Sequence, residues 1–257
     1  MPIPGWSGKQ VCGMVPREEM IPLISGTCAG PGLPHHPRHR GNRTMGTVAE
    51  APRPTNKGHG TRQRILDVAQ DSILSKGFDA TSIEEIVAGA AITRSGFFYH
   101  FPDKNALARA LLERYLEEDR AVLGGVFARA AELSDDPLQR FLIAMKLLAE
   151  VMDDMPNGHP GCIVATVCYQ ERLFDQQVRD LNAQSVLLWR KRFRTRLDLI
   201  AERYPPRIAV DLDDLADMLS AVADGGIIIS KVLRDPMALP RQILLYRDFV
   251  KAVFAGT

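Results

Sequence analysis

An all-α fold is predicted by three features of this 257-residue sequence. From Thr61 onward, apolar residues recur every three or four positions, which is the period of an amphipathic helix. Thr81 and Thr93 stand just before two of these stretches, where an N-cap oxygen is needed. No window shows the alternating, β-branched pattern of a strand between turn signals. The nearest candidate, "GIIIS" at 226–230, lies inside a helical pattern that begins at Leu212.

Three short helices are expected first. The inward stripe of the first consists of Ile65, Leu66, Ala69 and Ile73. Gly77 follows as its C-terminal stop. The second opens at Thr81, with Glu84 three residues later in a capping-box pattern, and breaks at Gly89. Thr93 caps the third, which runs to about Tyr99.

A longer helix is expected to start after Pro102 and Asp103 and to run beyond Tyr115. Amphipathic stretches then follow at about 137–154, 162–173, 175–203, 211–233 and 240–254. Because each is apolar on one side only, the predicted architecture is a set of helices packed on one another.

The first 55 residues have a different composition. By residue 60 the chain has used 10 of its 20 glycines and 9 of its 17 prolines. Such a segment cannot bury enough apolar surface to offset its ordering entropy, so we predict a disordered tail at 1–55. Its "HHPRHR" cluster at 35–40 is interpreted as a solvated basic patch rather than a metal or phosphate site. We expect translation to begin at Met45, which would make residues 1–44 an artefact of the assigned start.

Composition limits the class of protein. The chain is 46% hydrophobic and 25% charged, with a formal net charge of +1, so any nucleic-acid-binding patch must be local. No apolar run reaches the roughly 18–20 residues of a membrane span, and no secretory signal is visible, which favours the cytosol. Cys162 and Cys168 lie about 9 Å apart on different helix faces, so they should stay reduced. No zinc spacing appears, and no metal or cofactor is expected.

The stretch "AITRSGFFYHFPDKNAL" at 91–107 crowds four aromatic residues into five positions and holds no acid before Asp103. Three short helices with a tight turn make a helix-turn-helix, whose third helix enters the DNA major groove. Close approach to phosphates explains the missing acids. Arg94 can read a guanine edge, and Gly96 removes bulk where the helix meets the groove. Phe98 and Phe101 are interpreted as the wedge that packs this helix.

Further contacts follow from the same placement. Thr93 and Ser95 are expected to reach bases or phosphates. Thr81 and Ser82 cap a helix N-terminus that suits a phosphate. Tyr99, His100 and Lys104 are expected to meet the DNA backbone, because a cation such as Lys104 at a helix start otherwise opposes the dipole.

The 47 residues from "TRQRILDVAQ" to "DKNAL" resemble the DNA-binding region of the TetR family of transcriptional regulators. The markers include "RILDVA", "GFDATSI" and "FYHFPDK". Phe98 departs from the usual tyrosine, and Ala91 from the usual turn glycine, so the turn is expected to be strained. The resemblance implies a DNA-binding domain at 56–103 and a helical effector-binding and dimerisation domain at 104–257. It also implies a homodimer that binds a palindromic operator, most often as a repressor released by a small-molecule effector.

The effector domain offers weaker patterns. "GCIVATVCYQERLFDQQVRDLN" resembles a segment that lines or borders the pocket in many members. Apolar and polar side chains at helical spacing suggest a small-molecule site. The candidate pocket residues are Met145, Met152, Cys162, Thr166, Tyr169, Gln170 and Trp189. A thiol at a helix N-terminus has a lowered pKa, so Cys162 is either a reactive sensor or a buried structural residue.

The last two helices are the predicted dimer interface. Glycines inside 211–233 destabilise that helix, and this cost is expected to be offset if they let a partner helix approach closely. The candidate interface residues are Leu219, Val222, Gly226, Tyr246 and Val250. The alternative is that these stripes only complete each subunit's own core. An enzyme is disfavoured because no catalytic constellation appears, and a non-specific nucleoid protein because the charge is near neutral.

Overall fold

The computed structural model of the protein describes residues 56–155 and 158–255. The predicted tail, the proposed start at Met45 and the "HHPRHR" cluster lie outside these residues. Within the described ranges every regular element is helical, which confirms the all-α prediction. None of the helices in these ranges is long and apolar enough to cross a membrane.

The observed helices follow the expected order. Their bounds are α1 Asn56–Ala80, α2 Ile83–Gly89, α3 Arg94–His100, α4 Lys104–Leu133, α5 Pro137–Asp153, α6 Ile163–Tyr169, α7 Gln176–Arg203, α8 Leu212–Leu233 and α9 Ala238–Ala255. The stretch predicted at 162–173 is two elements, because the 3₁₀ turn η2 at Glu171–Leu173 follows α6.

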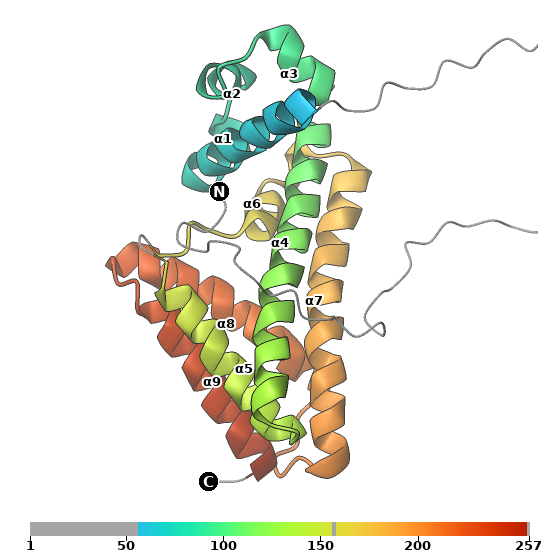
Figure 1. The fold of residues 1–257 in the computed structure, drawn as a ribbon, viewed down its shortest axis with the longest axis vertical. Helices are drawn as coiled ribbons and strands as arrows, with labels where there is room; N and C mark the ends of the chain where they lie inside the picture. Colours follow the sequence, from blue (N-terminus) through green and yellow to red (C-terminus); the bar gives the residue numbers. More distant parts are fainter. Residues whose placement is uncertain (1–55, 156–157, 256–257) are drawn as a thin grey trace, which may run out of the picture.

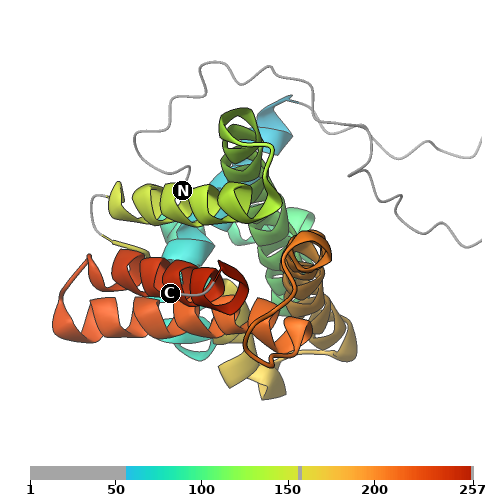
Figure 2. The same cartoon turned by 90° about the horizontal axis from the view of Figure 1, so that it is seen from below.

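The molecule is elongated, with α1, α2 and α3 gathered at one end of the long helix α4 (Figure 1). Helix α7 runs beside α4, while α5, α8 and α9 form a layer against them. Seen along the long axis, α9 lies between α5 and α8 (Figure 2). The short helix α6 lies between this layer and the α1–α3 end, so it is placed to touch both (Figure 1).

Side-chain oxygens cap the helices at the α1–α3 end. The Oγ1 atom of Thr93 accepts a hydrogen bond from the N–H of Gly96 at 3.1 Å, which confirms Thr93 as the N-cap of α3. Asp103 caps α4 in the same way, accepting from Ala106 N at 2.7 Å. Of the two predicted caps of α2, Ser82 is confirmed, because its side chain accepts a hydrogen bond from Glu85 N, whereas Thr81 was wrong. Thr81 is buried, so its hydroxyl faces inward instead.

Two backbone positions bend the chain as the sequence indicated. Gly77 adopts φ +88°, which interrupts the helical geometry of α1. Ala91, in the turn between α2 and α3, has φ +52°. A non-glycine residue in this left-handed region is strained, so the predicted strain at Ala91 is confirmed.

The buried side chains form two clusters. One contains the inward faces of α1, α2 and α3, the start of α4 up to Leu112, α6, and the first turn of α7 at Val178. The other contains the rest of α4 and α7 with α5, α8 and α9. The hydrophobic division therefore does not follow the boundary proposed at residue 103, because α6 packs with the helix-turn-helix core.

Candidate nucleic-acid interface and buried cavity

Helix α3 is fixed to the core by Phe97 and Phe101, which are 0% and 1% exposed. Their spacing of four places both rings on one side of the helix. The prediction named Phe98 instead of Phe97, and this was wrong: Phe98 is 38% exposed. One residue turns a helix by about 100°, so only one of two adjacent aromatic residues can face the core.

The outer side of α3 presents the predicted contact residues to solvent. Thr93, Arg94 and Ser95 are exposed, and Tyr99 is 76% exposed. The Thr93 and Ser95 hydroxyls lie 3.0 Å apart. A side-chain carbon on Gly96 would lie 3.2 Å from Thr93 Oγ1, so glycine also protects the N-cap. This side combines hydroxyl groups, a guanidinium and a phenol on one short helix.

Arg94 is held by two neighbours. Its Nη1 atom lies 2.7 Å from Glu84 Oε1, with about two-thirds of each side chain exposed. Its guanidinium also lies 5.7 Å from the centre of the Phe98 ring. An exposed ion pair contributes only about 0.2–1 kcal/mol, so a base edge can replace Glu84 at small cost.

Two of the predicted contacts have structural roles instead. The Thr81 hydroxyl is buried and donates to Gly77 O at 2.8 Å. The Lys104 ammonium is part-buried and donates to the carbonyls of Thr81 at 2.7 Å and Phe78 at 3.3 Å. These bonds satisfy the chain between α1 and α2, so the structure does not support a phosphate contact by either side chain.

Ser82 and His100 remain near the surface. Ser82 is exposed. His100 is partly covered, and burial followed by the charge of Arg62 lowers the pKa of its imidazole. His100 is therefore neutral at pH 7 and could meet a phosphate as a hydrogen-bond donor rather than as a cation.

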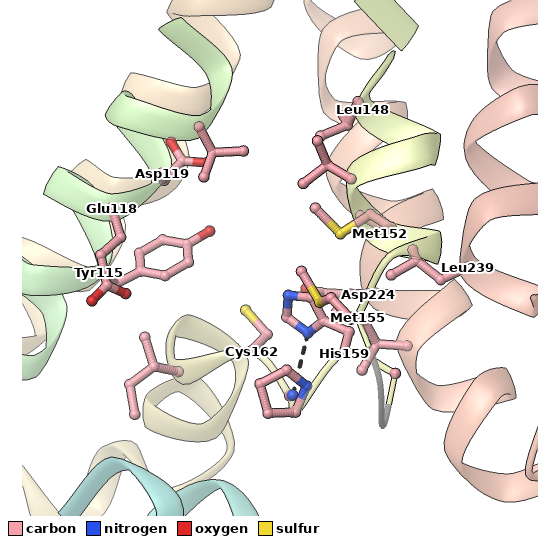
Figure 3. Close-up of a pocket in the computed structure, with 18 of the residues that line it drawn as sticks. Tyr115, Glu118, Asp119, Leu148, Met152, Met155, His159, Cys162, Asp224 and Leu239 are labelled. Carbon is pink, nitrogen blue, oxygen red and sulfur yellow. Dashed lines mark hydrogen bonds between the residues drawn. The ribbon is translucent and has the colours of Figure 1, made fainter. Parts of the chain in front are cut away.

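A cavity of about 330 Å³ lies on the other side of the helix-turn-helix core. Helices α4, α5 and α8 supply half of its lining residues, and the segment Gly158–Ile163 supplies a further part of the wall. Figure 3 shows Tyr115, Met152 and His159 around this space. Gln70 and Leu74 of α1 also line it, so the DNA-binding end forms part of the same cavity. Its size and largely apolar walls are typical of a small-molecule site.

Three of the seven predicted pocket residues line this cavity: Met152, Cys162 and Trp189. The other four do not. Met145 is fully buried in the hydrophobic core, and the Thr166 hydroxyl donates to Cys162 O within α6. Tyr169 is 81% exposed. A stripe on one helix predicts which residues face inward, but it does not predict where the packed helices leave a gap.

Gln170 occupies a different site from the one predicted. Its Oε1 atom accepts a hydrogen bond from Phe78 N at 2.7 Å, at the break that Gly77 makes within α1. A side-chain carbon on Gly77 would lie 2.8 Å from Gln170 Nε2, so glycine allows this close approach. Helix α6 therefore reaches from the cavity, at Cys162, to the helix-turn-helix core, at Gln170.

The polar groups in the cavity were missed by the sequence patterns. They belong to Tyr115, Glu118, Asp119, His159 and Asp224. Tyr115 points into the cavity from α4, opposite Met152 on α5 (Figure 3). Carboxylates on long helices usually face solvent. The sequence therefore gave no indication that the carboxylates of Glu118, Asp119 and Asp224 face the cavity.

Burial controls the protonation of these groups. It lowers the pKa of His159 to about 4, helped by the charge of Lys231. Nδ1 of His159 accepts from Gly161 N at 3.2 Å. Burial raises the pKa of the Cys162 thiol to about 12, with Asp224 adding to the effect. The reactive-sensor interpretation of Cys162 is therefore not supported, because the thiolate is disfavoured. Burial also raises the pKa values of Glu118, Asp119 and Asp224.

The predicted dimer residues belong to the subunit's own core. Leu219, Gly226, Tyr246 and Val250 are buried, and Val222 packs partly buried against the same cluster. The Tyr246 hydroxyl donates to Leu215 O at 2.9 Å. A side-chain carbon on Gly226 would lie 2.9 Å from Leu239 Cδ1, so this glycine serves the contact between α8 and α9. These five residues therefore pack within their own subunit, as the alternative interpretation expects for them, and the position of the dimer interface stays a prediction.

The exposed helix-turn-helix is that of a DNA-binding regulator, and a partly open cavity lies behind it. The family model for bacterial regulatory proteins of the tetR family matches residues 65–111. The chain is 22% identical to the transcriptional repressor DhaR of Mycobacterium sp. (strain GP1), over 68% of this chain and 84% of DhaR. It is 26% identical to the regulator RutR of Escherichia coli (strain K12), over 54% of this chain and 64% of RutR.

A TetR transcriptional regulator from Chloroflexus aurantiacus has the same fold, with a TM-score of 0.64 and 21% identity over 78% of this chain and 98% of that one. Residues 65–111 are therefore a DNA-binding region of the TetR family, as the helix-turn-helix motifs indicated, and the curated relatives named above are transcriptional regulators. The protein is a DNA-binding regulator and not an enzyme.

Proposed function

We propose that this protein is a ligand-responsive repressor that binds a palindromic operator as a homodimer and releases it when a small molecule fills the cavity. The observation that carries this proposal is that α1 forms part of the cavity wall through Gln70 and Leu74. A ligand there contacts the same helix that supports α3. It can act only if it binds the DNA-competent arrangement less tightly than the released one.

Two connections support this coupling. Helix α4 begins under the helix-turn-helix, where Lys104 bonds to Phe78 and Thr81. About three turns later, Tyr115 of the same helix enters the cavity. Helix α6, about 10 Å long at 1.5 Å per residue, joins Cys162 at the cavity to Gln170 on the α1 break. We propose that an effector moves these helices and changes the separation of the two recognition helices in the dimer.

The proposed operator contacts are the groups that remain accessible around α3. They are Ser82, Thr93, Arg94, Ser95, Gly96, Tyr99 and His100. Arg94 would read a guanine, while the hydroxyl and aromatic groups would meet bases and phosphates. Thr81 and Lys104 are assigned to holding the backbone beneath them.

A second copy of the chain would cover the apolar outer sides of α8 and α9. Ile228, Ile229 and Val232 on α8 are exposed, Val232 by 75%, and so are Leu245 and Phe249 on α9. A side-chain carbon on Gly225 of the same helix would have no heavy atom of another described element within 4 Å. Two such pairs of helices would make a four-helix interface around a two-fold axis. That symmetry suits successive major grooves about 34–36 Å apart.

Repression is supported by DhaR, a repressor by name. The proposed partners are operator DNA, a second subunit and an unidentified effector, and no cofactor is proposed. Because operator DNA is chromosomal, we place the protein in the cytoplasm.

A gel-shift titration with the DNA upstream of the protein's own gene tests operator binding. We expect a shift that survives excess random DNA and weakens with salt as phosphate contacts are lost. Equal binding to random DNA of the same length would contradict an operator-specific repressor.

Sedimentation of Val232→Arg tests the dimer. We expect a folded monomer with greatly weakened operator affinity, because two arginines would meet across the axis. Lys231→Arg is the matched control, since its side chain already carries a charge. A Val232→Arg protein that stays dimeric would place the interface elsewhere.

A further inference from the structure

The cavity is unusual in the signs of its charges. Among its described lining residues there is neither lysine nor arginine, whereas Glu118, Asp119 and Asp224 all contribute carboxyl groups. The rest of the wall is mainly apolar, with Leu148, Met152 and other aliphatic side chains. A ligand that enters this space therefore meets an apolar wall and negative or hydrogen-bond-accepting ends.

Two of the three carboxylates already have cationic partners behind the wall. Asp119 is bonded to Arg192 of α7, and Glu118 Oε1 lies 3.7 Å from Arg114 Nε. Asp224 forms no ion pair with any described residue. The neighbouring Cys162 thiol is neutral and supplies no charge. Asp224 is thus a partly buried carboxyl group whose charge is not compensated within the described chain, and such a group is costly unless a cation joins it.

The other polar groups do not favour an anion. Among the described lining residues only His159 could become cationic, and its low pKa of about 4 keeps it neutral at pH 7. The Tyr115 hydroxyl points into the cavity and makes no hydrogen bond to a described residue, and burial raises its pKa. It can donate or accept as a neutral group. An anionic ligand would find no positive partner here and would be repelled by the carboxylates.

We propose that the effector is a hydrophobic organic cation, an apolar amine or quaternary ammonium compound, whose charge lies against Asp224 while its body fills the space between α4 and α5. The inference rests on the proposed function only in taking this cavity as the effector site. Such a ligand would replace the missing cation of Asp224 and bury its hydrocarbon against Leu148 and Met152. Its size is limited by the cavity of about 330 Å³.

Calorimetric titration with three probes of similar shape tests the charge. Benzyltrimethylammonium is the cation, neopentylbenzene its uncharged carbon analogue, and phenylacetate an anion. We expect the cation to bind at least about tenfold more tightly than the neutral probe, about 1.4 kcal/mol, and the anion not to bind. Equal binding of cation and neutral probe, or no binding of the cation, would overturn the inference.

Variants assign the preference to one residue. Asp224→Asn should remove the cation's advantage while leaving neutral-probe binding in place, and Asp224→Glu should keep the advantage. Asp217→Asn is the matched control, because Asp217 lies two turns earlier on α8 and pairs with Arg190 outside the cavity. A cation advantage that persists in Asp224→Asn would overturn the assignment. If Asp224→Asn does not fold, Asp224→Glu serves as the test instead. If Asp224→Glu no longer binds the cation more tightly than the neutral probe, the negative charge at this position is not the cause of the preference.

Operator binding is measured on the same unliganded samples. A protein that shifts its operator but shows no preference for the cation would refute only the ligand class. One that binds no operator would refute the proposed function, whatever it binds in the cavity.

Discussion

The DNA-reading end and the cavity are both made of amphipathic helices, but their functional groups come from different distances along the chain. The exposed groups of α3 lie within Thr93–His100, one short continuous stretch. The cavity takes Gln70 from α1, Tyr115 from α4, Met152 from α5 and Asp224 from α8. A local motif is sufficient for the first, whereas the second exists only after distant helices pack.

This difference also explains why the predictions from sequence failed in different ways in the two regions. At the DNA-reading end, the cap at Thr93 was predicted correctly and the helix bounds to within about five residues, and the errors at Phe98 and Thr81 are shifts by one residue. In the rest of the chain the helix bounds were again nearly correct, but Met145 and Tyr246 were assigned to surfaces they do not reach. Local patterns determine helices well and their partners poorly.

The largest expected effect is at Phe97, and it tests whether α3 depends on one buried ring. Phe97→Ala should destabilise the DNA-binding end by about 3–5 kcal/mol, because it opens a cavity in a fully buried site. Hydrogen exchange should rise across α1–α3, with operator binding lost. Phe98→Ala is the control, expected to cost under about 1 kcal/mol of stability. Similar melting temperatures for both variants would show that the two rings have been assigned wrongly.

A second pair separates reading from support. Arg94→Ala should lose about 1–3 kcal/mol of operator affinity and relax base preference at one position, with stability unchanged. Lys104→Met should instead lower stability by about 1–3 kcal/mol, since two backbone carbonyls lose a charged donor. The measurements are operator affinity and thermal melting for each variant. A Lys104→Met protein that melts normally but binds all DNA more weakly would restore the phosphate contact predicted from sequence.

A smaller effect is expected in the cavity as pH falls. The pKa of His159 is lowered to about 4, below its ordinary value near 6.5. Between these values the unfolded chain binds the proton and the folded chain does not, so stability is full above about pH 6.5 and declines toward pH 4. We expect His159→Gln to lessen this decline by about 1–2 kcal/mol in pH-dependent melts. An unchanged pH profile would mean that His159 is hydrated in the folded protein.

The smallest expected change is at the junction of the two regions. Gln170→Leu removes the acceptor for Phe78 N and should cost about 1 kcal/mol. Because α6 reaches from Cys162 to Gln170, the variant should also weaken the effect of a cavity ligand on operator affinity. Tyr169→Leu, at an exposed neighbouring position, is the control. If a cavity ligand changes operator affinity as much in Gln170→Leu as in the unmodified protein, the bond at Gln170 does not connect the two sites, and α1 and α4 are the remaining connections.

The sequence by itself determined the helices, their caps and the helix-turn-helix, because apolar periodicity, capping oxygens and turn residues act over a few neighbouring positions. It also carried the strain at Ala91, which follows from placing a non-glycine residue in a tight turn. Only the tertiary structure decided that Gln170 joins the α1 break, that Asp224 faces a cavity without a cationic partner, and that Gly226 packs inside one subunit. Each of these depends on a contact between helices far apart in the chain, and the same amphipathic stripe can be buried by its own subunit or by another.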